Sequence, residues 1–458
     1  MRQLILISIL FLISVQAYSQ EEKPNIILIN IDDMGWKDVG FMGSDYYNTP
    51  FLDSLALRGM IFDNGYSSAA NCAPSRASML TGLWSSRHGI LTVASSERGK
   101  SENRKIIPIA NTQTLDKKFV TFPQILNNNG YQTIHAGKWH ISDSALDFGF
   151  DHSIAGGSNG APRSYFPPYQ NVNWEGPETD YLSDAIMDKL IIRTENLKSP
   201  YLLYYSPYAV HTPIQAKKEL THKYVDKSSN LEQNNPDYAA MVENLDHNLK
   251  RLFLSLKEKD LLKNTLIIFS SDNGGLKGIT SQAPLRSGKG SYYEGGIRVP
   301  MFFVWEGKIS AGSDSSPISN LDFYPTILDV VGISSARPND GNSLKGVLLG
   351  NKELAERPLF WHFPIYLAAY SQADDGIRDS LFRTRPGSAI RLGKWKLQYY
   401  FEDHEMELFN LESDIAERRD LSQSHPEQRD HLLKLLQEWW LEIQAPIPNV
   451  PNPEFALK

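Results

Sequence analysis

Two short runs of almost unbroken apolar residues constrain the fold of this chain most strongly. One covers residues 25–31 (Asn-Ile-Ile-Leu-Ile-Asn-Ile) and the other covers residues 265–271 (Thr-Leu-Ile-Ile-Phe-Ser-Ser). A strand with one exposed face alternates apolar and polar residues, and these runs do not alternate. Each is therefore predicted to be a strand buried on both faces, the kind found in parallel sheets that helices cover on both sides.

Helical and strand patterns alternate over the first 350 residues. A third strand is predicted over residues 201–205, near His211. Between it and the run at 265–271, one apolar stripe with helical spacing is formed by Tyr238, Met241, Val242, Leu245, Leu249, Leu252 and Leu256. This order predicts an α/β fold with a mostly parallel sheet sandwiched by helices.

The pattern changes after about residue 350. Short strands are predicted there, at residues 357–361, 388–392, 395–400 and 406–409, followed by an amphipathic helix over residues 425–443. A chain of 458 residues is too long for one small core. We therefore predict a large α/β domain over residues 23–350 and a smaller C-terminal α+β subdomain, with a small antiparallel sheet and one helix, over residues 351–458.

The N-terminus has the features of a secretory signal peptide over residues 1–19. Arg2 supplies the positive end, residues 4–15 an apolar run, and Ala17-Tyr18-Ser19 a small-x-small cleavage site. The apolar run is too short to span a bilayer, and no later stretch is long and apolar enough to do so. We expect an exported protein, periplasmic or secreted, without a membrane span. Its net charge of −7 argues against a nucleic-acid partner.

Acidic and amide side chains follow the two apolar runs directly. Asp32 and Asp33 come after the first run, and Asp272 and Asn273 come after the second. In open α/β sheets ligands bind at this carboxyl edge, and hard oxygen ligands favour Ca²⁺ or Mg²⁺ over zinc. Alternatives are a turn or helix cap at Asp32-Asp33 and a hairpin turn at Asp272-Asn273-Gly274-Gly275. The coincidence of both pairs favours a metal site.

The only cysteine of the chain, Cys72, lies between a loop rich in small residues and a predicted helix N-terminus. Exported proteins usually pair their cysteines or lack them, so a lone one calls for a chemical explanation. A soft thiolate would be a poor ligand beside hard carboxylate oxygens. The sequence is chemically coherent if Cys72 is converted to a group that offers oxygen.

Cationic residues near the predicted strand ends could bind an anion. Lys138 and His140 follow a predicted strand at residues 132–134, and glycines flank Lys289, where backbone could approach a ligand closely. Lysine suits a tetrahedral oxyanion, although most loop lysines are simply solvated. His211 could protonate a basic leaving alcohol, although a lone histidine is more often structural.

Together these segments resemble the type I sulfatases of the alkaline-phosphatase superfamily, over about residues 23–421. Within this family, the sequence most resembles the bacterial polysaccharide sulfatases. The resemblance rests on the order and spacing of Asp32-Asp33-Met34-Gly35, Cys72-Ala73-Pro74-Ser75-Arg76 with the following residues to Gly82, Gly137-Lys138-Trp139-His140, His211-Thr212-Pro213, Ser271 to Gly275, and Gly288 to Pro300. One local departure is Ile141-Ser142, where the family usually has Leu-Gly.

The resemblance implies a role for each matched residue. Cys72 would be oxidised to formylglycine (3-oxoalanine), whose hydrate is the nucleophile. Ca²⁺, in preference to Mg²⁺, would be held by Asp32, Asp33, Asp272, Asn273 and the modified Cys72. Arg76 would orient the hydrate, Lys138 and Lys289 would clamp the sulfate, His211 would protonate the leaving alcohol, and His140 would take a proton from the hydrate.

The C-terminal segments resemble sulfatases that act on sulfated polysaccharides. We therefore expect a sulfated glycan substrate, with exo action on a poly- or oligosaccharide. We also expect maturation of Cys72 by a formylglycine-generating or anaerobic sulfatase-maturating enzyme. As a hypothesis, His362 and Arg385 reach the cleft and contact the sugar or a neighbouring anionic group.

Other functions remain open at this point. The same nucleophile and metal would serve a formylglycine-dependent phosphonate or phosphate ester hydrolase, and the substrate could be a simple aryl sulfate. A catalytically silent glycan-binding relative would have lost some of the residues Cys72, Arg76, Lys138 and His211, and this chain keeps all four. The last alternative is an ordinary reduced thiol in a motif that matches by coincidence.

Overall fold

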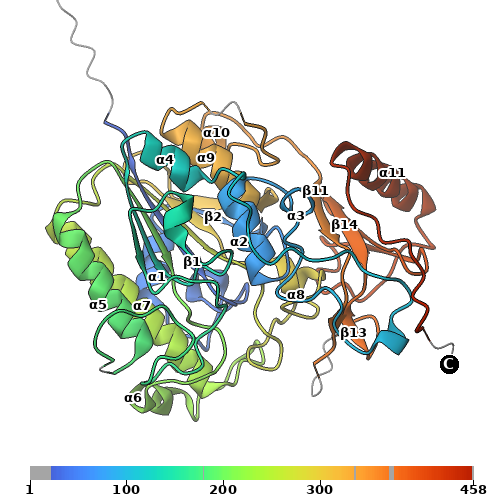
Figure 1. Ribbon diagram of the computed structural model, residues 1–458, viewed down its shortest axis with the longest axis horizontal. Helices are drawn as coiled ribbons and strands as arrows, with labels where there is room; N and C mark the ends of the chain where they lie inside the picture. The colour runs from blue at the N-terminus through green and yellow to red at the C-terminus, as the bar shows by residue number, and fades with distance from the viewer. Residues whose placement is uncertain (1–21, 179, 335–336, 371–375, 456–458) are drawn as a thin grey trace, which may run out of the picture.

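An eight-stranded, mostly parallel sheet runs through the larger part of the molecule in this computed structural model (Figure 1). The structure describes residues 22–178, 180–334, 337–370 and 376–455, so the predicted signal peptide lies outside the described residues. The strand order is β5 (His152–Ile154), β4 (Gln132–Gly137), β6 (Tyr201–Ser206), β1 (Asn25–Ile31), β7 (Thr265–Ser271), β8 (Phe302–Val304), β2 (Met60–Phe62) and β9 (Gly312–Asp314).

The central strands are parallel, as predicted. Strand β1 pairs in parallel with β6 on one side and β7 on the other, and β4 pairs in parallel with β5 and β6. The exception is β8, which is antiparallel to both of its neighbours, β7 and β2. Every residue of β1 and of β7 is buried, so both apolar runs are strands covered on two faces.

Alternate residues of β1 enter two different cores. Ile27, Ile29 and Ile31 belong to one apolar cluster, and Ile26 and Leu28 belong to the other. Figure 1 shows the helices on the two sides of the sheet. The first core includes residues of α1 (Pro50–Ala56), α5 (Leu182–Arg193) and α7 (Pro236–Glu258); the second includes residues of α2 (Cys72–Thr81), α4 (Phe122–Asn128), α9 (Phe323–Val330) and α10 (Lys345–Leu348).

A second, antiparallel sheet forms the C-terminal part of the molecule. It is covered on one side by helix α11, whose Trp439 ring stacks on Phe360 at 4.5 Å between centroids. The predicted α/β fold with a smaller C-terminal α+β part is confirmed. The strand order is β11 (Leu359–Phe363), β14 (Gly387–Leu392), β15 (Trp395–Tyr400) and β16 (Met406–Asn410), and α11 covers Pro426–Glu442.

Smaller elements complete the fold. Two strand pairs join β3 (Gly65–Tyr66) to β10 (Ile318–Ser319) and β12 (Leu367–Ala368) to β13 (Phe382–Thr384); the short helices are α3 (Ser85–His88), α6 (Lys218–Thr221) and α8 (Glu294–Ile297).

Buried ion pairs join the two parts of the molecule. Lys396 of β15 contacts Glu294 of α8 at 2.9 Å and Glu417 at 2.9 Å, and all three side chains are inaccessible to solvent. The Trp361 indole of β11 donates to the carbonyl of Ser67 at 2.9 Å. Because breaking a buried pair leaves an uncompensated charge, these contacts hold the C-terminal sheet in one position against the larger part.

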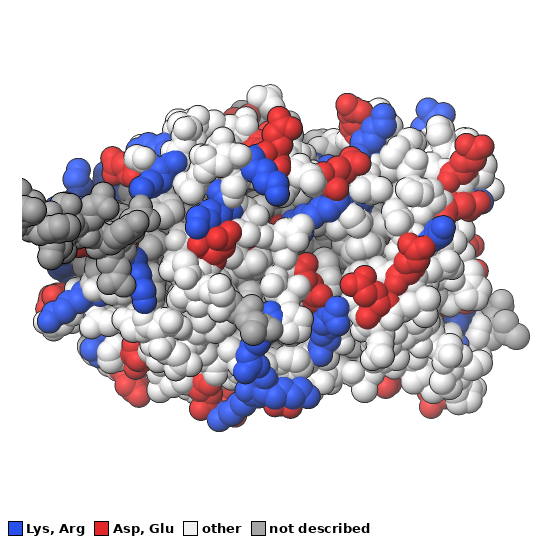
Figure 2. All heavy atoms as spheres, turned by 90° about the horizontal axis from the view of Figure 1, so that it is seen from above, with Lys and Arg blue, Asp and Glu red and all other residues white. Residues whose placement is uncertain are grey.

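The described surface carries both signs of charge. Acidic and basic side chains lie side by side on the face shown in Figure 2. An anionic substrate must therefore be recognised by particular cations and not by a broad field over the whole protein.

Within the described residues, no helix has the length and apolar character needed to cross a membrane.

Candidate functional site

Four neighbouring strands of the large sheet end at one edge, and each delivers a predicted site residue there. Strand β1 is followed by Asp32 and β7 by Asp272, whose amide donates to the carbonyl of Ile31 at 3.0 Å. Strand β4 is followed by Lys138, and β6 leads into the loop that carries His211. Because β4, β6, β1 and β7 are adjacent, residues far apart in the sequence meet at this carboxyl edge.

Cys72 joins this edge from the N-terminus of α2. It is the first residue of the helix and is 1% exposed, so the predicted position of Cys72 at a helix start is confirmed. Its Sγ lies 3.9 Å from Oδ1 of Asp33. Ligand atoms of Asp32, Asp33, Cys72 and His211 all lie within 4.8 Å of one another.

Asp272 and Asn273 do not form a hairpin turn. Strand β7 does pair with an antiparallel neighbour, β8, but 30 residues separate the end of β7 at Ser271 from the start of β8 at Phe302. The alternative of a tight turn at this position is wrong. Instead, the Asn273 amide nitrogen donates to Oδ1 of Asp33 at 2.8 Å, which ties the ends of β1 and β7 together.

Three cations are bound to the carboxylates of the site. Lys138 Nζ lies 2.8 and 2.7 Å from the two oxygens of Asp32, and Arg76 Nε lies 2.7 Å from Oδ2 of Asp272. Lys289 Nζ donates to Oδ2 of Asp33 at 2.7 Å. The structure therefore brings together the lysines and arginine that the sequence singled out, and none of the three is a solvated surface residue, since Lys138 and Arg76 are fully buried and Lys289 is 12% exposed.

Two histidines face the same cluster. His211 Nδ1 lies 2.7 Å from the Thr212 carbonyl and Nε2 lies 3.5 Å from Oδ2 of Asp33, so only Nε2 can meet a reacting group. His140 has a buried Nδ1 without a hydrogen-bond partner among the described residues. Burial, together with the charges of Lys138 and Arg76, holds the pKa of His140 well below its usual range, so the His140 ring is neutral and has one unprotonated nitrogen.

Burial dominates the acid-base properties of the site. It raises the pKa of Asp32 to about 7 despite the opposing charge of Lys138, and it raises the pKa of the Cys72 thiol to about 12. Burial alone would raise the pKa of Asp33 as well, but Lys289 and His211 hold it below its usual range. The unmodified thiol is therefore protonated at neutral pH and is a weak nucleophile.

The donor set at this edge fits a hard divalent cation. Three carboxylates and one amide converge, and oxygen ligands of this kind are preferred by Ca²⁺ and Mg²⁺. The amide oxygen Oδ1 of Asn273 is buried and has no hydrogen-bond donor among the described residues, whereas the nitrogen of the same amide is bound twice. An orphaned buried acceptor is costly unless something positive pairs with it. A metal ion would supply that partner.

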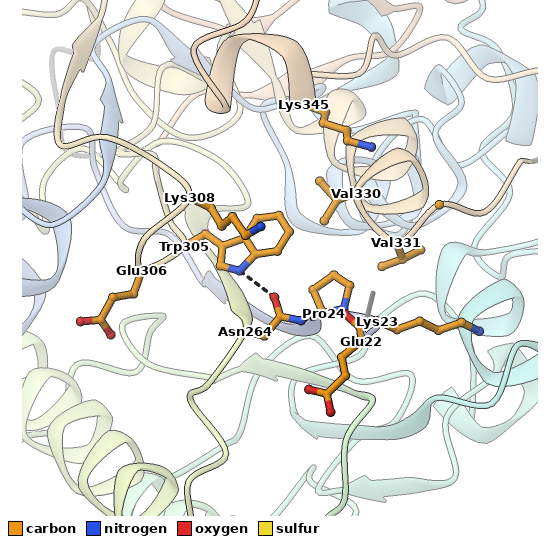
Figure 3. Close-up of a pocket in the computed structure, with 11 residues that line it drawn as sticks. Glu22, Lys23, Pro24, Asn264, Trp305, Glu306, Lys308, Val330, Val331 and Lys345 are labelled. Carbon is orange, nitrogen blue, oxygen red and sulfur yellow. Dashed lines mark hydrogen bonds between the residues drawn. The ribbon is translucent and has the colours of Figure 1, made fainter. Parts of the chain in front are cut away.

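A hollow of about 850 Å³ lies at the opposite edge of the sheet (Figure 3). It lies where β1 and β7 begin, next to Pro24 and Asn264, and Trp305 donates to Asn264 across it at 3.2 Å. Its lining includes no histidine or cysteine, and its acidic residues are Glu22 and Glu306. The groups that can perform chemistry are at the carboxyl edge.

His362 does not reach the site, so the hypothesis that it contacts the sugar is wrong for this structure. The residue is in β11, 3% exposed, and packs against Trp439 of α11. Its Nδ1 lies 2.7 Å from the Ser388 hydroxyl and its Nε2 lies 3.1 Å from the Pro446 carbonyl. Both ring nitrogens are therefore satisfied inside the C-terminal part of the molecule.

Arg385 is not brought to the site either. Its guanidinium forms ion pairs with Asp379 at 2.5 Å and Glu402 at 2.6 Å, and it lies over the Phe382 ring. The two carboxylates neutralise its charge and fix its orientation. No described contact joins Arg385 to the carboxyl-edge cluster, and the expected contact with an anionic sugar is not supported.

The burial of His362 predicts a pH-dependent stability. Burial lowers the pKa of His362 to about 4, whereas a histidine of the unfolded chain has a pKa near 6.5. Below pH 6.5 the unfolded chain binds a proton at this histidine that the folded chain does not bind, which favours unfolding. The free energy of unfolding therefore contains a term from His362 of about 3 kcal/mol at most. This term is complete above pH 6.5 and is lost between pH 6.5 and about 4. The variant His362→Gln should show a shallower fall of Tm over this window than the wild type.

The control for this measurement is His431→Gln, at an exposed position of α11. Thermal unfolding of both variants and the wild type is followed from pH 4 to 7. A His362→Gln profile as steep as that of the wild type would contradict the assignment, as would a His431→Gln profile that is equally flattened.

One contact of the site was not predicted from the sequence. The Tyr204 hydroxyl of β6 lies 3.5 Å from Arg76 Nη1 and 3.5 Å from Asn30 Nδ2. The sequence does contain an indication of this contact, because a tyrosine and an asparagine inside fully buried strands need polar partners. Tyr204 and the Lys138 carbonyl, which accepts from Arg76 at 3.1 Å, fix the guanidinium beside Cys72.

Comparison with known proteins gives the class to which this fold and site belong. The profile of the family described as Sulfatase matches residues 24–333, and the profile described as N-sulphoglucosamine sulphohydrolase, C-terminal, matches residues 288–444. The chain belongs to the sulfatase family and is a sulfuric ester hydrolase. Members of this family generally use a metal ion and a formylglycine made from cysteine.

Particular relatives align with most of the chain. A sulfatase of Formosa agariphila is 31% identical over 529 aligned positions that cover 96% of this chain and 93% of the relative. The N-acetylgalactosamine-6-sulfatase of Rattus norvegicus is 30% identical over 401 positions, which cover 79% and 72%. The crystal structure of Ps i-CgsB in complex with k-i-k-neocarrahexaose superposes with a TM-score of 0.76 at 30% identity and covers 93% and 94%.

Proposed function

We propose that this sulfatase removes sulfate from a sulfated carbohydrate and that the nucleophile is a formylglycine hydrate made from Cys72. The observation that carries the proposal is the meeting of Cys72, three carboxylates, an amide and three cations at one edge of the sheet. A hard-oxygen site beside fixed positive charges suits a tetrahedral anion, and an oxygen at position 72 suits it better than a thiol.

The metal of the proposal is Ca²⁺, with Asp32, Asp33, Asp272, Asn273 and residue 72 as its ligands. When bound, it would neutralise the carboxylates and polarise an oxygen of the hydrate. The orphaned Oδ1 of Asn273 supports this set. His211 Nε2 lies close to Asp33 as well, and we assign it to substrate because its other nitrogen is held by Thr212 and its free nitrogen is at the open side, with 17% of the side chain exposed.

The cations bind the sulfate group and the charge that it gains. Lys138 approaches from the end of β4 and Lys289 from the loop before α8, so the two ammonium groups reach the cluster from different elements. Arg76 is held by Asp272 and Tyr204 next to residue 72 and would stabilise the attacking oxygen. Donors fixed before reaction need no reorganisation as charge develops.

The first half of the reaction transfers the sulfate group to the enzyme. One hydroxyl of the hydrate loses its proton to solvent, and its oxygen forms a bond to sulfur while the bond from sulfur to the sugar oxygen breaks. The leaving alkoxide is strongly basic and takes the Nε2 proton of His211. This step needs the imidazolium form, because the Nδ1 proton is bound to the Thr212 carbonyl and because burial and the charge of Lys289 lower the pKa of His211 to about 4. The negative charge of the sulfate ester bound beside it would favour that form. The product is a sulfated hemiacetal at residue 72 and a free sugar hydroxyl.

The second half restores the aldehyde. His140 accepts the proton of the remaining hydroxyl, the carbonyl forms again, and the bond between carbon and the sulfate oxygen breaks. Sulfate leaves, and addition of one water regenerates the hydrate. The neutral, buried and unpartnered state of His140 Nδ1 suits a base that acts only when the hydroxyl is placed against it.

Carbohydrate as the substrate is supported by relatives that cover most of this chain. One is named for N-acetylgalactosamine 6-sulfate, and another was solved with k-i-k-neocarrahexaose bound. We propose exo action because Cys72 and Lys138 are almost inaccessible, at 1% and 0% exposure. A sulfate on a chain end can enter such a site more easily than one in the middle of a polymer.

We also propose an exported enzyme, periplasmic or secreted, that is matured before use. The predicted signal peptide at residues 1–19 supports the export. Maturation would require a formylglycine-generating or anaerobic sulfatase-maturating enzyme that acts on the motif starting at Cys72. Because Cys72 is buried once α2 is folded, modification is expected on the unfolded or partly folded chain.

The decisive experiment is the mass of the tryptic peptide of residues 59–76 from active enzyme. We expect this peptide to be lighter than the cysteine form by one sulfur and two hydrogens less one oxygen. The same preparation should release sulfate from sulfated oligosaccharides and should cleave p-nitrophenyl sulfate faster than the corresponding phosphate and phosphonate esters. An unmodified thiol in fully active enzyme, or a preference for the phosphorus esters, would contradict the proposal.

A further inference from the structure

Arg383 lies beside the catalytic cluster although no motif pointed to it. It is the middle residue of β13, and its Nη1 lies 3.4 Å from the carbonyl of Lys289, whose ammonium binds Asp33. A Cβ built on Gly290 would stand 2.8 Å from Nε of Arg383. The guanidinium therefore lies flat against the loop that carries Lys289, and the positive φ of 83° at Gly290 marks a glycine that allows this close approach.

A second arginine, Arg98, lies next to it. The backbone amide of Arg98 donates to the carbonyl of Tyr366 at 3.3 Å, and Tyr366 leads directly into β12, the antiparallel partner of β13. Burial and the charge of Arg98 lower the pKa of Arg383 to about 9, and the charges of Asp33 and Cys72 act on it in the opposite sense. The guanidinium groups of Arg98 and Arg383 are thus within electrostatic reach of each other and of Cys72.

These two arginines differ from their neighbours in having no acidic partner. Arg378 pairs with Asp403 and Glu405, and Arg385 pairs with two carboxylates as described above. Across the part of the chain that the structure describes, neither Arg98 nor Arg383 forms an ion pair. Arg98 Nη2 donates to the Val93 carbonyl at 2.6 Å, and the buried Nε of Arg383 has no hydrogen-bond partner among the described residues.

An unpaired, partly buried guanidinium is costly, because it has lost water without gaining a counter-ion. Arg383 is nevertheless held in place: its guanidinium lies 3.8 Å from the centroid of the Tyr370 ring, and the neighbouring Thr384 hydroxyl donates to the carbonyl of Gly290. A cation that is positioned but unpaired can bind an anion without further reorganisation.

We propose that Arg98 and Arg383 form a second anion subsite, which binds an additional anionic group of the sugar while the scissile sulfate is at residue 72. This proposal rests on the proposed function and narrows it to substrates with two anionic groups close together. The second group is a sulfate ester or a uronate carboxylate, since both present oxygens that match the fork of a guanidinium.

The test compares matched sugars that differ in one anionic group. The substrates are monosulfated and disulfated forms of the same sugar, and a monosulfated disaccharide with a uronate carboxylate against its carboxyl-reduced form. We expect wild-type kcat/KM to be higher for one of the doubly anionic forms. In Arg383→Gln and Arg98→Gln that preference should fall about 10- to 100-fold, the effect of one charge-assisted contact. The pair that shows the preference tells sulfate from carboxylate.

Arg378→Gln is the matched control, since this arginine lies nearby but is already paired. It should keep the wild-type preference, and Arg383→Lys should keep part of it. The subsite is disproved if the wild type shows no preference for a second anion, or if the preference survives in both glutamine variants. An equal loss in Arg378→Gln would show a structural effect and would also overturn the assignment.

Failure of the proposed function would be seen separately. If matured wild type cleaves no sulfate ester, the function is wrong, and the subsite is still tested by binding. Calorimetric titration of the wild type with a disulfated disaccharide would then be compared with Arg383→Gln, and equal dissociation constants would overturn the subsite as well.

Discussion

Replacement of Cys72 by alanine is expected to lower kcat for sulfate esters by about 10⁴-fold or more, because it removes the side chain that is converted to the formylglycine hydrate. Every other polar group of the cluster either binds charge or moves a proton. The cations would still bind sulfate, so the variant should retain affinity for the substrate while losing turnover. Sulfate release by matured enzyme under single-turnover conditions measures this directly.

The matched variant is Cys72→Ser, which places a hydroxyl where the thiol was. If a simple alcohol were sufficient as nucleophile, this variant would keep substantial activity. We expect it to be as inactive as Cys72→Ala when the mass of peptide 59–76 shows an unmodified serine. An active, unmodified serine enzyme would contradict the need for a hydrate with two hydroxyl groups.

Loss of activity must not come from loss of the fold. Cys72 is buried at the first position of α2, where alanine is a good helix former, and within the described residues its thiol makes one weak polar contact, at 3.9 Å to Asp33. We therefore expect the Tm of Cys72→Ala to lie close to that of the wild type. A large drop in Tm would mean that the kinetic result reports unfolding and not chemistry.

The central sheet could be predicted from the sequence because its strands are buried on both faces. An unbroken apolar run such as residues 25–31 has few alternatives, and the acidic pair that follows it marks where the strand reaches solvent. The limits of the predicted strands agree with β1 and β7 in full. Helix α7 was equally visible, since its stripe over residues 238–256 faces one core.

The site was predicted because its residues follow strands directly. Once β1 and β7 are neighbours, Asp33 and Asn273 must lie close together, and the 2.8 Å contact between them follows from topology. The part of the site beside the β12–β13 pair could not be predicted in this way. Glu402, in the turn that follows β15, forms an ion pair with Arg385 and leaves Arg383 without one in the described part of the chain. The sequence pattern does not show which of the two arginines this carboxylate reaches.

His362 was misplaced although the sequence held the necessary signal. It lies in Leu-Phe-Trp-His-Phe, residues 359–363, another unbroken apolar run, and all five residues are buried. The pattern that identified β1 as covered on two faces applies here too, with α11 on one face. A histidine in such a strand is predicted to be buried and neutral, and not to bind a ligand.

Calcium is expected to have the second largest effect, on both activity and stability. An ion that binds only the folded protein stabilises it by about 4 kcal/mol when its concentration is 1,000 times Kd. We expect chelation to lower the Tm by several degrees and to abolish sulfate release, and added Ca²⁺ to restore both. The reason is local: the buried Oδ1 of Asn273 has no hydrogen-bond donor within the described residues, and a bound ion would pair with it as well as with the buried carboxylates of Asp32, Asp33 and Asp272.

Asn273→Ala tests whether the ion lies where the donors converge. It removes the amide oxygen that has no partner within the described residues and should weaken Ca²⁺ binding about 100-fold, as loss of a metal-site group commonly does. At the same Ca²⁺ concentration the stabilisation would fall from about 4 to about 1.4 kcal/mol. The Ca²⁺-induced rise in Tm, measured over a concentration series, should therefore shrink and shift to higher concentration.

Asn25→Ala supplies the matched control for this effect. Asn25 is an equally buried asparagine in the same sheet, but it starts β1 and so lies at the opposite edge, where its side chain bonds Lys263 and Thr265. It should lower the Tm by a similar amount at every Ca²⁺ concentration and leave the response to Ca²⁺ unchanged. An unchanged response in Asn273→Ala, or a lost response in Asn25→Ala, would place the ion elsewhere. Because Tm is measured without substrate, the result is independent of whether Cys72 has been modified.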